Sequence, residues 1–164
     1  MTSQEISKVY GNKLRVRVCG VLIEDDSILL VKHRGIGANG ELLIPPGGGM
    51  EFGSSAEENL KREFKEETGL SIKVCDFLFI SEFLDSELHA IELFFKVEHV
   101  SGSIAIGIDP EMSTEDQIIN DVKMIKFSEL LKMDQQCLHG MLRGHRTGLD
   151  LLNTRGFFKF ENYI

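Results

Sequence analysis

One segment of the chain joins a glycine-rich loop to an acidic, helix-forming pattern, and this segment most restricts how the chain can fold. The loop is Pro45–Gly49, which ends in three consecutive glycines. In the helical pattern that follows, Glu63, Glu66 and Glu67 lie at positions i, i+3 and i+4. Because an α-helix turns by about 100° per residue, these carboxylates share about one third of its circumference. Carboxylates so close together repel one another, and we therefore expect a cation, most simply a divalent metal ion, to bind between them.

An acidic helix face that only meets solvent is the alternative interpretation of the same residues. The helical wheel argues against it, because the apolar positions Ala56, Leu60 and Phe64 overlap the acidic sector. Glu63 and Glu67 are therefore expected at the edge of the buried face. An uncompensated carboxylate there would cost several kcal/mol or would lose its charge. The pattern thus favours a metal site over a solvated face.

The spacing of these residues resembles the Nudix box, the signature G-x5-E-x7-R-E-U-x-E-E-x-G-U of the Nudix hydrolases, in which U is a bulky apolar residue. The box covers Gly48–Leu70 and departs from the signature only at Ser54, where the family usually has glutamate. In the family, that glutamate is thought mainly to support the loop and the box arginine, which is Arg62 here. The resemblance therefore implies that Arg62 lacks one ion-pair partner.

Ser54 has a local use of its own in the sequence. Ser54 and Glu57 have the spacing of a capping box, in which the serine hydroxyl accepts a backbone N–H and the glutamate reaches back. We therefore expect a helix over Ser55–Thr68, closed by Gly69 at its C-terminal end.

Apolar patterns along the rest of the chain predict strands before and after this helix. They are expected at Leu14–Ile23, Ile28–His33, Leu42–Ile44, Ile72–Leu84, His89–Val100, Asp121–Phe127 and Gly156–Phe160. A helical turn is expected from Ser128, and a helical tail over about 135–152. This order indicates an α/β fold, an α/β/α sandwich with a central mixed β-sheet, which is also the fold that the Nudix resemblance implies.

Length and composition indicate a single domain over residues 1–164. With 42% hydrophobic residues the chain can bury a sizeable core, and no linker, repeat or low-complexity segment divides it. The formal net charge of −8 argues against general binding to nucleic acid. The polar amino terminus and the lack of a long apolar run argue against secretion and against a membrane span. Three widely spaced cysteines favour reduced thiols, so we expect a cytoplasmic protein.

The resemblance implies a metal-dependent hydrolase. Glutamate oxygens suit Mg²⁺ or Mn²⁺, and Glu63, Glu66 and Glu67 are the expected ligands, with a carbonyl from Gly47 or Gly48 as a further one. Such ions neutralise a diphosphate and orient a water for attack on phosphorus. The implied reaction cleaves the pyrophosphate bond of a nucleoside diphosphate linked to another moiety, such as a nucleotide, a sugar or a damaged dNTP, and releases a nucleoside monophosphate.

The resemblance also assigns roles to residues outside the ligand set. Arg62 is expected to orient the glutamates through hydrogen bonds, and Glu63 to take part in catalysis. At Gly48 and Gly49, glycine torsions let the backbone pass close to the substrate. Arg34 stands where Nudix proteins often carry a basic residue near the phosphates, and a solvated strand end is the equally open alternative.

An acidic segment far beyond the box is the expected source of a general base. Glu115 is the first candidate and Asp116 the second, both within Asp109–Asp116. A solvated loop is the alternative for each of them. The five histidines lack metal-ligand spacing and are interpreted as ordinary surface or partly buried residues.

The altered box position leaves a second function open, namely a nucleotide-binding regulatory domain with little or no hydrolysis. The presence of all three box glutamates favours the enzyme. The segment Asp85–Leu88 has neither the proline nor the tyrosine that marks two of the family's substrate classes, so the expected partner is a small nucleoside diphosphate derivative of unassigned identity. Homodimers are common in the family, and self-association is an open alternative to a monomer.

Overall fold

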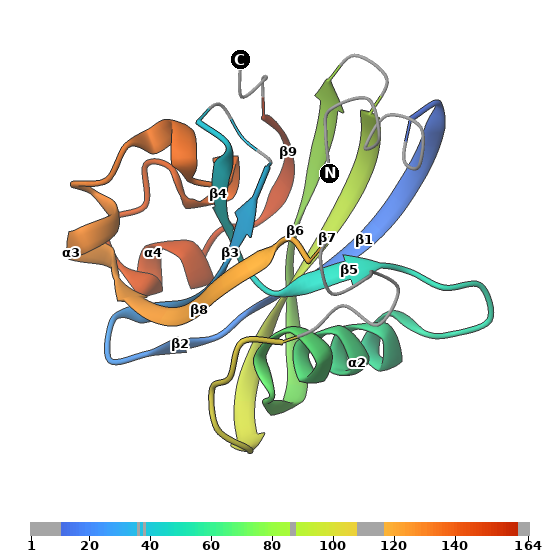
Figure 1. Ribbon diagram of the computed structural model, residues 1–164, viewed down its shortest axis with the longest axis horizontal. Coiled ribbons are helices and arrows are strands. Elements are labelled where there is room, and N and C mark those ends of the chain that lie inside the picture. Colours follow the sequence, from blue (N-terminus) through green and yellow to red (C-terminus); the bar gives the residue numbers. More distant parts are fainter. Residues whose placement is uncertain (1–10, 36, 38, 86–87, 108–116, 161–164) are drawn as a thin grey trace.

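The larger of two β-sheets forms the centre of the molecule (Figure 1). The computed structural model describes residues 11–35, 37, 39–85, 88–107 and 117–160. The larger sheet is five-stranded, in the order β5-β1-β7-β6-β9. In chain order these strands are β1 (Lys13–Val21), β5 (Gly47–Gly49), β6 (Ser71–Asp85), β7 (Leu88–Ser101) and β9 (Gly156–Phe160). The β1–β7 and β6–β9 pairs are parallel and the β1–β5 and β6–β7 pairs antiparallel, which confirms the predicted mixed sheet and α/β fold.

A second, four-stranded sheet is formed by the strands around β3. Its members are β2 (Ile23–Glu24), β3 (Ser27–Arg34), β4 (Glu41–Ile44) and β8 (Ile119–Lys126). Strand β3 pairs antiparallel with each of the other three. The sequence predicted one central sheet, and the structure has two. Both edges of β1 are occupied, one by β7 and the other by β5, so β3 finds no free edge of β1 and builds a sheet of its own.

Helix α2 (Ala56–Thr68) packs where the two sheets meet. Leu60 and Phe64 are fully buried in a cluster that includes Val18 of β1 and Val31 of β3. A Cβ at Gly20 of β1 would overlap the Phe64 ring, so glycine lets the helix approach the sheet closely. This packing fixes the rotation of α2 about its axis, and with it the direction of the acidic face.

The helix begins one residue later than the sequence predicted. Its N-cap is Ser55, and the capping box is formed with Glu58, so the predicted pair Ser54–Glu57 is wrong. The N–H of Ser54 instead donates to the carbonyl oxygen of Glu51 at 3.3 Å, which makes Ser54 part of the preceding turn. Gly69 closes the helix with a φ of 74°, as expected.

The carboxyl-terminal segment covers the side of the molecule that faces away from α2 (Figure 1). It does not form the predicted helical tail. It consists of short pieces: α3 (Phe127–Leu130), η1 (Gln135–Cys137), η2 (Gly140–Leu142) and α4 (Gly148–Leu152). Gly144, with a φ of 82°, breaks the helical path. His139 leaves it as well, because its N–H donates to Leu43 of β4 at 2.9 Å. Tertiary hydrogen bonds to β4 thus replace a continuous helix.

Cys19, Cys75 and Cys137 are free thiols, in agreement with the sequence analysis. No helix in the described residues is both long enough and apolar enough to cross a membrane.

Candidate active site

Helix α2 carries the three box glutamates, and it places them against the glycine loop, whose three glycines form strand β5. Arg62 Nη2 donates to Glu63 Oε1 at 2.9 Å, and its Nη1 donates to Glu66 Oε2 at 3.0 Å. The N–H of Gly47 donates to Glu67 Oε2 at 2.8 Å. One guanidinium and one loop amide therefore gather three carboxylates at the junction of helix and sheet.

The loop lies directly against the helix because two of its three glycines occupy positions that have no room for a side chain. A Cβ at Gly48 would overlap the carboxyl group of Glu63. A Cβ at Gly47 would overlap the carbonyl oxygen of Val18 on β1, the strand with which β5 pairs. Any side chain at either position would push the loop away from the glutamates.

The electrostatic balance of the cluster is negative. Burial raises the pKa of Glu63 to about 7; Arg62 opposes this shift, whereas the charges of Glu67 and Glu66 add to it. The pKa of Arg62 is raised in turn, because the acids around it outweigh its partial burial. A single arginine therefore does not compensate the carboxylates of this site.

Arg62 has a third acidic partner that the sequence analysis did not identify. Glu51 Oε1 lies 3.3 Å from Arg62 Nη2. Glu51 belongs to the segment between β5 and α2, three residues before Ser54. Because position 54 is serine and not glutamate, Arg62 was expected to lack one ion-pair partner. The serine supplies no ion pair to Arg62, and the third acidic partner comes from a different position in the same segment.

His33 is a second residue near the site that the sequence analysis did not single out. It is buried, with 7% of its surface exposed, and its Nε2 lies 3.8 Å from Glu67 Oε1 and has no hydrogen-bond partner among the described residues. Strand periodicity contained a signal, because Leu29, Val31 and His33 alternate along β3 and the first two pack against α2. A histidine that continues such a row is expected to face the same helix.

Arg34, the predicted phosphate-binding residue, lies at the exposed end of β3. Its Nη2 donates to the carbonyl oxygen of Gln117 at 3.2 Å, and its backbone N–H donates to that of Ile118 at 2.7 Å. The candidate general bases Glu115 and Asp116 lie outside the described residues. Gln117 is the first described residue after them, so Arg34 contacts the chain where the acidic segment leads into β8.

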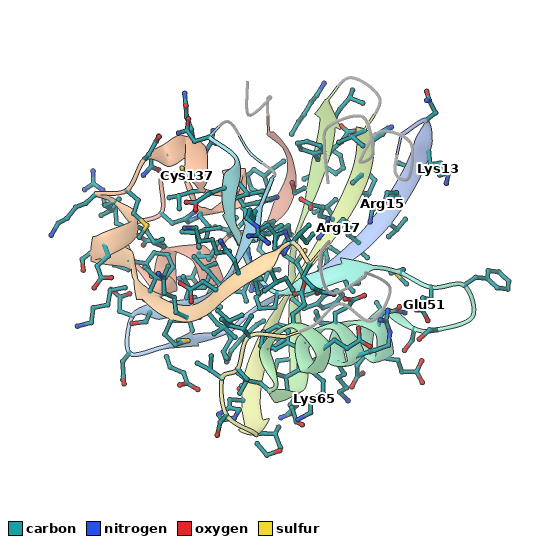
Figure 2. The ribbon with its side chains drawn as sticks, in the orientation of Figure 1. Lys13, Arg15, Arg17, Glu51, Lys65 and Cys137 are labelled. Carbon is teal, nitrogen blue, oxygen red and sulfur yellow. The ribbon has the colours of Figure 1, made fainter. Side chains whose placement is uncertain are left out.

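A row of basic side chains runs along β1, and its Arg17 end lies beside the loop, where Arg17 pairs with Gly49 (Figure 2). Lys13, Arg15 and Arg17 alternate along the strand and therefore share one face of the sheet. Arg17 Nη2 lies 3.4 Å from the carbonyl oxygen of Gly47, within reach of a weak hydrogen bond. A Cβ at Gly49 would lie 3.6 Å from Arg15 Nη2, an ordinary van der Waals distance. The predicted ligand Gly47 and the predicted substrate-binding residue Gly49 are thus both flanked by arginines.

A buried hydrogen bond between a histidine and a glutamate joins the carboxyl-terminal segment to the larger sheet. His139 Nε2 and Glu92 Oε2 are 2.9 Å apart, and both residues are at least 95% buried, with exposed fractions of 3% and 4%. The N–H of Met141 donates to His139 Nδ1 at 3.3 Å, which leaves the ring proton on Nε2, facing the carboxylate. Burial alone would raise the pKa of Glu92, but His139 and then Arg17 hold it at about 2.

A family model and a curated relative both match this chain. The model of the NUDIX domain matches residues 13–142. A relative from Methanocaldococcus jannaschii described as ADP-ribose pyrophosphatase is 36% identical over 96 residues, which cover 57% of this chain and 56% of the relative. The chain thus spans about half the length of this curated relative.

Solved structures resemble most of the arrangement of strands and helices. A NUDIX hydrolase from Nitrosomonas europaea has a TM-score of 0.64 at 24% identity, with 79% of this chain and 84% of that chain covered. A MutT NUDIX hydrolase from Burkholderia pseudomallei has a TM-score of 0.63 at 20% identity, with 85% and 96% covered. At these identities the likeness concerns the fold. Because the family model covers well over half of its residues, the chain belongs to the NUDIX domain family.

Proposed function

We propose that the protein is a metal-dependent hydrolase that cleaves the pyrophosphate bond of a nucleoside diphosphate linked to another moiety and releases a nucleoside monophosphate. The observation that carries this proposal is the gathering of Glu63, Glu66 and Glu67 around one arginine at the glycine loop. The relative described as ADP-ribose pyrophosphatase supports it, since ADP-ribose is a nucleoside diphosphate linked to a sugar.

The residues of the site fit a divalent cation. The donors are carboxylate oxygens, which suit Mg²⁺ or Mn²⁺, and the raised pKa of Glu63 indicates that burial of the carboxylates is not fully compensated. Within the described part of the chain, no three acidic, histidine or cysteine side chains already surround one point as ligands. Arg62 holds Glu63 and Glu66. Binding would therefore require these two carboxylates to exchange part of their contact with Arg62 for the ion.

Each residue of the site has a proposed role. Glu63, Glu66 and Glu67 hold the metal, with the Gly47 carbonyl as a further ligand, and Arg62 orients two of these carboxylates. The bound ion supplies charge neutralisation of the diphosphate and a more acidic water.

The remaining roles concern the substrate and the water. The backbone of Gly48 and Gly49 and the side chain of Arg34 contact the substrate phosphates. Glu115 accepts the proton of the attacking water. The water oxygen bonds to phosphorus as the bridging P–O bond breaks, and the leaving phosphate keeps the bridging oxygen.

A product-release screen tests the proposal. The panel contains ADP-ribose, nucleotide sugars, dinucleoside polyphosphates and oxidised deoxynucleoside triphosphates, each with Mg²⁺, with Mn²⁺ and with EDTA. We expect chromatography to detect a nucleoside monophosphate from at least one compound with metal and none with EDTA. Binding without turnover across the panel would instead support the regulatory domain that the serine at position 54 leaves open. A cytoplasmic location, which was expected from the sequence, stays a prediction, and self-association stays an open alternative to a monomer.

A further inference from the structure

Three carboxylates hold Arg62, and one of them is not a box glutamate. Glu51 lies 3.3 Å from the guanidinium, compared with 2.9 Å for Glu63 and 3.0 Å for Glu66. Figure 2 shows Glu51 on the segment that leads from β5 into α2, beside the helix. We propose that Glu51 is a positioning residue that gives Arg62 an anionic partner of its own, so that Glu63 and Glu66 can turn to a metal ion. This inference rests on the proposed function, in which these two glutamates bind the metal.

The backbone around Glu51 is fixed to the helix, so its position is not that of a loose loop residue. Asn59 is fully buried, and its Oδ1 accepts the N–H of Glu51 at 2.9 Å. Its Nδ2 donates to the carbonyl oxygen of Ser55, the N-cap, at 2.8 Å. The Ser54 N–H donates to Glu51 O at 3.3 Å and closes the turn. The backbone is thus held in place by these hydrogen bonds, and only rotation about the side-chain bonds of Glu51 can move its carboxylate away from Arg62.

Arg62 and a metal ion compete for the same carboxylate oxygens. A guanidinium has five N–H donors in a planar fork, and it can stay paired with Glu51 while it releases part of its contact with Glu63 and Glu66. Without Glu51, the two box carboxylates alone would have to pair this partly buried side chain, of which 34% is exposed. They would be held more firmly by Arg62 and would bind a metal ion more weakly.

The exposure of Glu51 separates this role from a structural one. Its side chain is 56% exposed, and ion pairs so open to solvent contribute little to stability. Removing its charge should therefore weaken metal binding without unfolding the protein. Helix α2 offers a matched control pair, in which Glu57 Oε1 lies 2.6 Å from Lys61 Nζ and the Glu57 side chain is 58% exposed. Among the contacts of the described residues, Glu57 has none with Arg62.

The first experiment compares Glu51→Gln with Glu57→Gln. Mn²⁺ binding to the intact protein without substrate is measured by electron paramagnetic resonance of the free ion, and thermal unfolding is measured without metal. We expect the Mn²⁺ dissociation constant to rise by about tenfold in Glu51→Gln, the low end of effects seen when a ligand's supporting residue is changed. We expect Glu57→Gln to bind like the wild type and both variants to unfold at the wild-type temperature. Equal Mn²⁺ affinity in the two variants would overturn the proposal.

The second experiment asks whether Glu51 acts through Arg62. In an Arg62→Gln background, the further change Glu51→Gln is expected to leave Mn²⁺ affinity unchanged, because the residue that Glu51 positions is absent. A loss as large as in the wild-type background would show that Glu51 acts by itself, for example as a ligand, and would overturn the proposal.

A metal-free measurement keeps this inference separate from the proposed function. Proton exchange of the Arg62 guanidinium, followed by nuclear magnetic resonance, is expected to be faster in Glu51→Gln than in Glu57→Gln. If the wild type bound no Mn²⁺, the proposed function would fail, whereas this exchange rate would still decide whether Glu51 holds Arg62. Equal exchange rates in the two variants would show that Glu51 does not hold the Arg62 guanidinium.

Discussion

At the scale of single residues, Glu67 has the most constrained carboxylate of the site. Its side chain is 11% exposed, compared with 15% for Glu63 and 29% for Glu66. One oxygen accepts the N–H of Gly47, and the other faces His33 without a hydrogen bond to it. A carboxylate oriented by the loop on one side presents its second oxygen in a fixed direction, which is what a metal ligand requires.

Glu67→Gln is expected to remove most turnover while the fold is kept. The amide oxygen can still accept the Gly47 N–H, but the charge that would bind the metal is lost. A loss of about 3 kcal/mol of transition-state stabilisation corresponds to a rate about 100-fold lower. Turnover on the best compound of the screen and the unfolding temperature are the two measurements. Turnover close to that of the wild type would rule out Glu67 as a ligand.

Gly48→Ala is expected to weaken metal binding more than Gly49→Ala does. The new methyl group at position 48 would overlap the carboxyl group of Glu63, which must then move from its place beside Arg62. At position 49 the nearest atom, Arg15 Nη2, lies 3.6 Å away and leaves room for a methyl group. Mn²⁺ titration of both variants checks the difference, and equal affinities would show that the close approach at Gly48 does not matter.

At the scale of elements, the start of α2 connects the loop to the helix. Ser55 caps the helix, and Asn59 one turn later ties the loop to it through the N–H of Glu51. The position of the loop relative to the box glutamates therefore depends on a few hydrogen bonds at one helix end. A change at this end should affect stability and site geometry together.

Ser55→Ala and Ser54→Ala are expected to differ in stability. The Ser55 hydroxyl accepts the N–H of Glu58, and loss of such a cap costs about 1 kcal/mol. Ser54 contributes a backbone N–H to the turn, which alanine keeps, so its side chain should matter much less. Urea unfolding of both variants measures the free energy of unfolding. A larger loss in Ser54→Ala would return the cap to the position that the sequence analysis assigned.

At the scale of the whole molecule, Glu92 joins parts of the chain that lie far apart in the sequence. It pairs with His139 across 47 residues and with Arg17 of the neighbouring strand. Arg17 in turn reaches the carbonyl oxygen of Gly47 in the loop. The carboxyl-terminal segment, the larger sheet and the loop thus meet at one buried carboxylate, which must stay ionised to keep these contacts.

The pH dependence of stability is expected to contain the signature of Glu92. Its pKa is lowered to about 2 in the folded protein from 4.5, so its contribution is fully present above pH 4.5 and is lost as the pH falls toward 2. In Glu92→Gln the free energy of unfolding should be lower by about 2 kcal/mol at neutral pH, since a charged hydrogen bond is lost. It should also fall less steeply in acid than that of the wild type.

Urea unfolding at a series of pH values from about 7 to about 3 measures both effects. Glu98→Gln on the same strand is the control, because that side chain is 51% exposed. Identical acid profiles for wild type and Glu92→Gln would show that the buried carboxylate does not couple folding to pH.

The sequence determined the features that belong to one element or one short segment. The acidic face of α2 and most of the strands on either side of it were predicted, because helix and strand periodicity are local properties of the chain. Strand β5 was not, because three consecutive glycines carry no strand periodicity and were interpreted as a loop. The serine cap was misplaced by one residue, since Ser54 and Ser55 offer the same hydroxyl and only the turn to Glu51 distinguishes them.

Only the tertiary structure decided which distant side chains meet. His33 reaches Glu67, and His139 reaches Glu92, through strand pairing and packing that no local pattern encodes. The same holds for the division into two sheets, which follows from the occupied edges of β1, and for the carboxyl-terminal segment, whose hydrogen bonds to β4 replace a helix. Periodicity fixes the direction of a side chain relative to its own element, whereas its partner depends on how all elements share the interior.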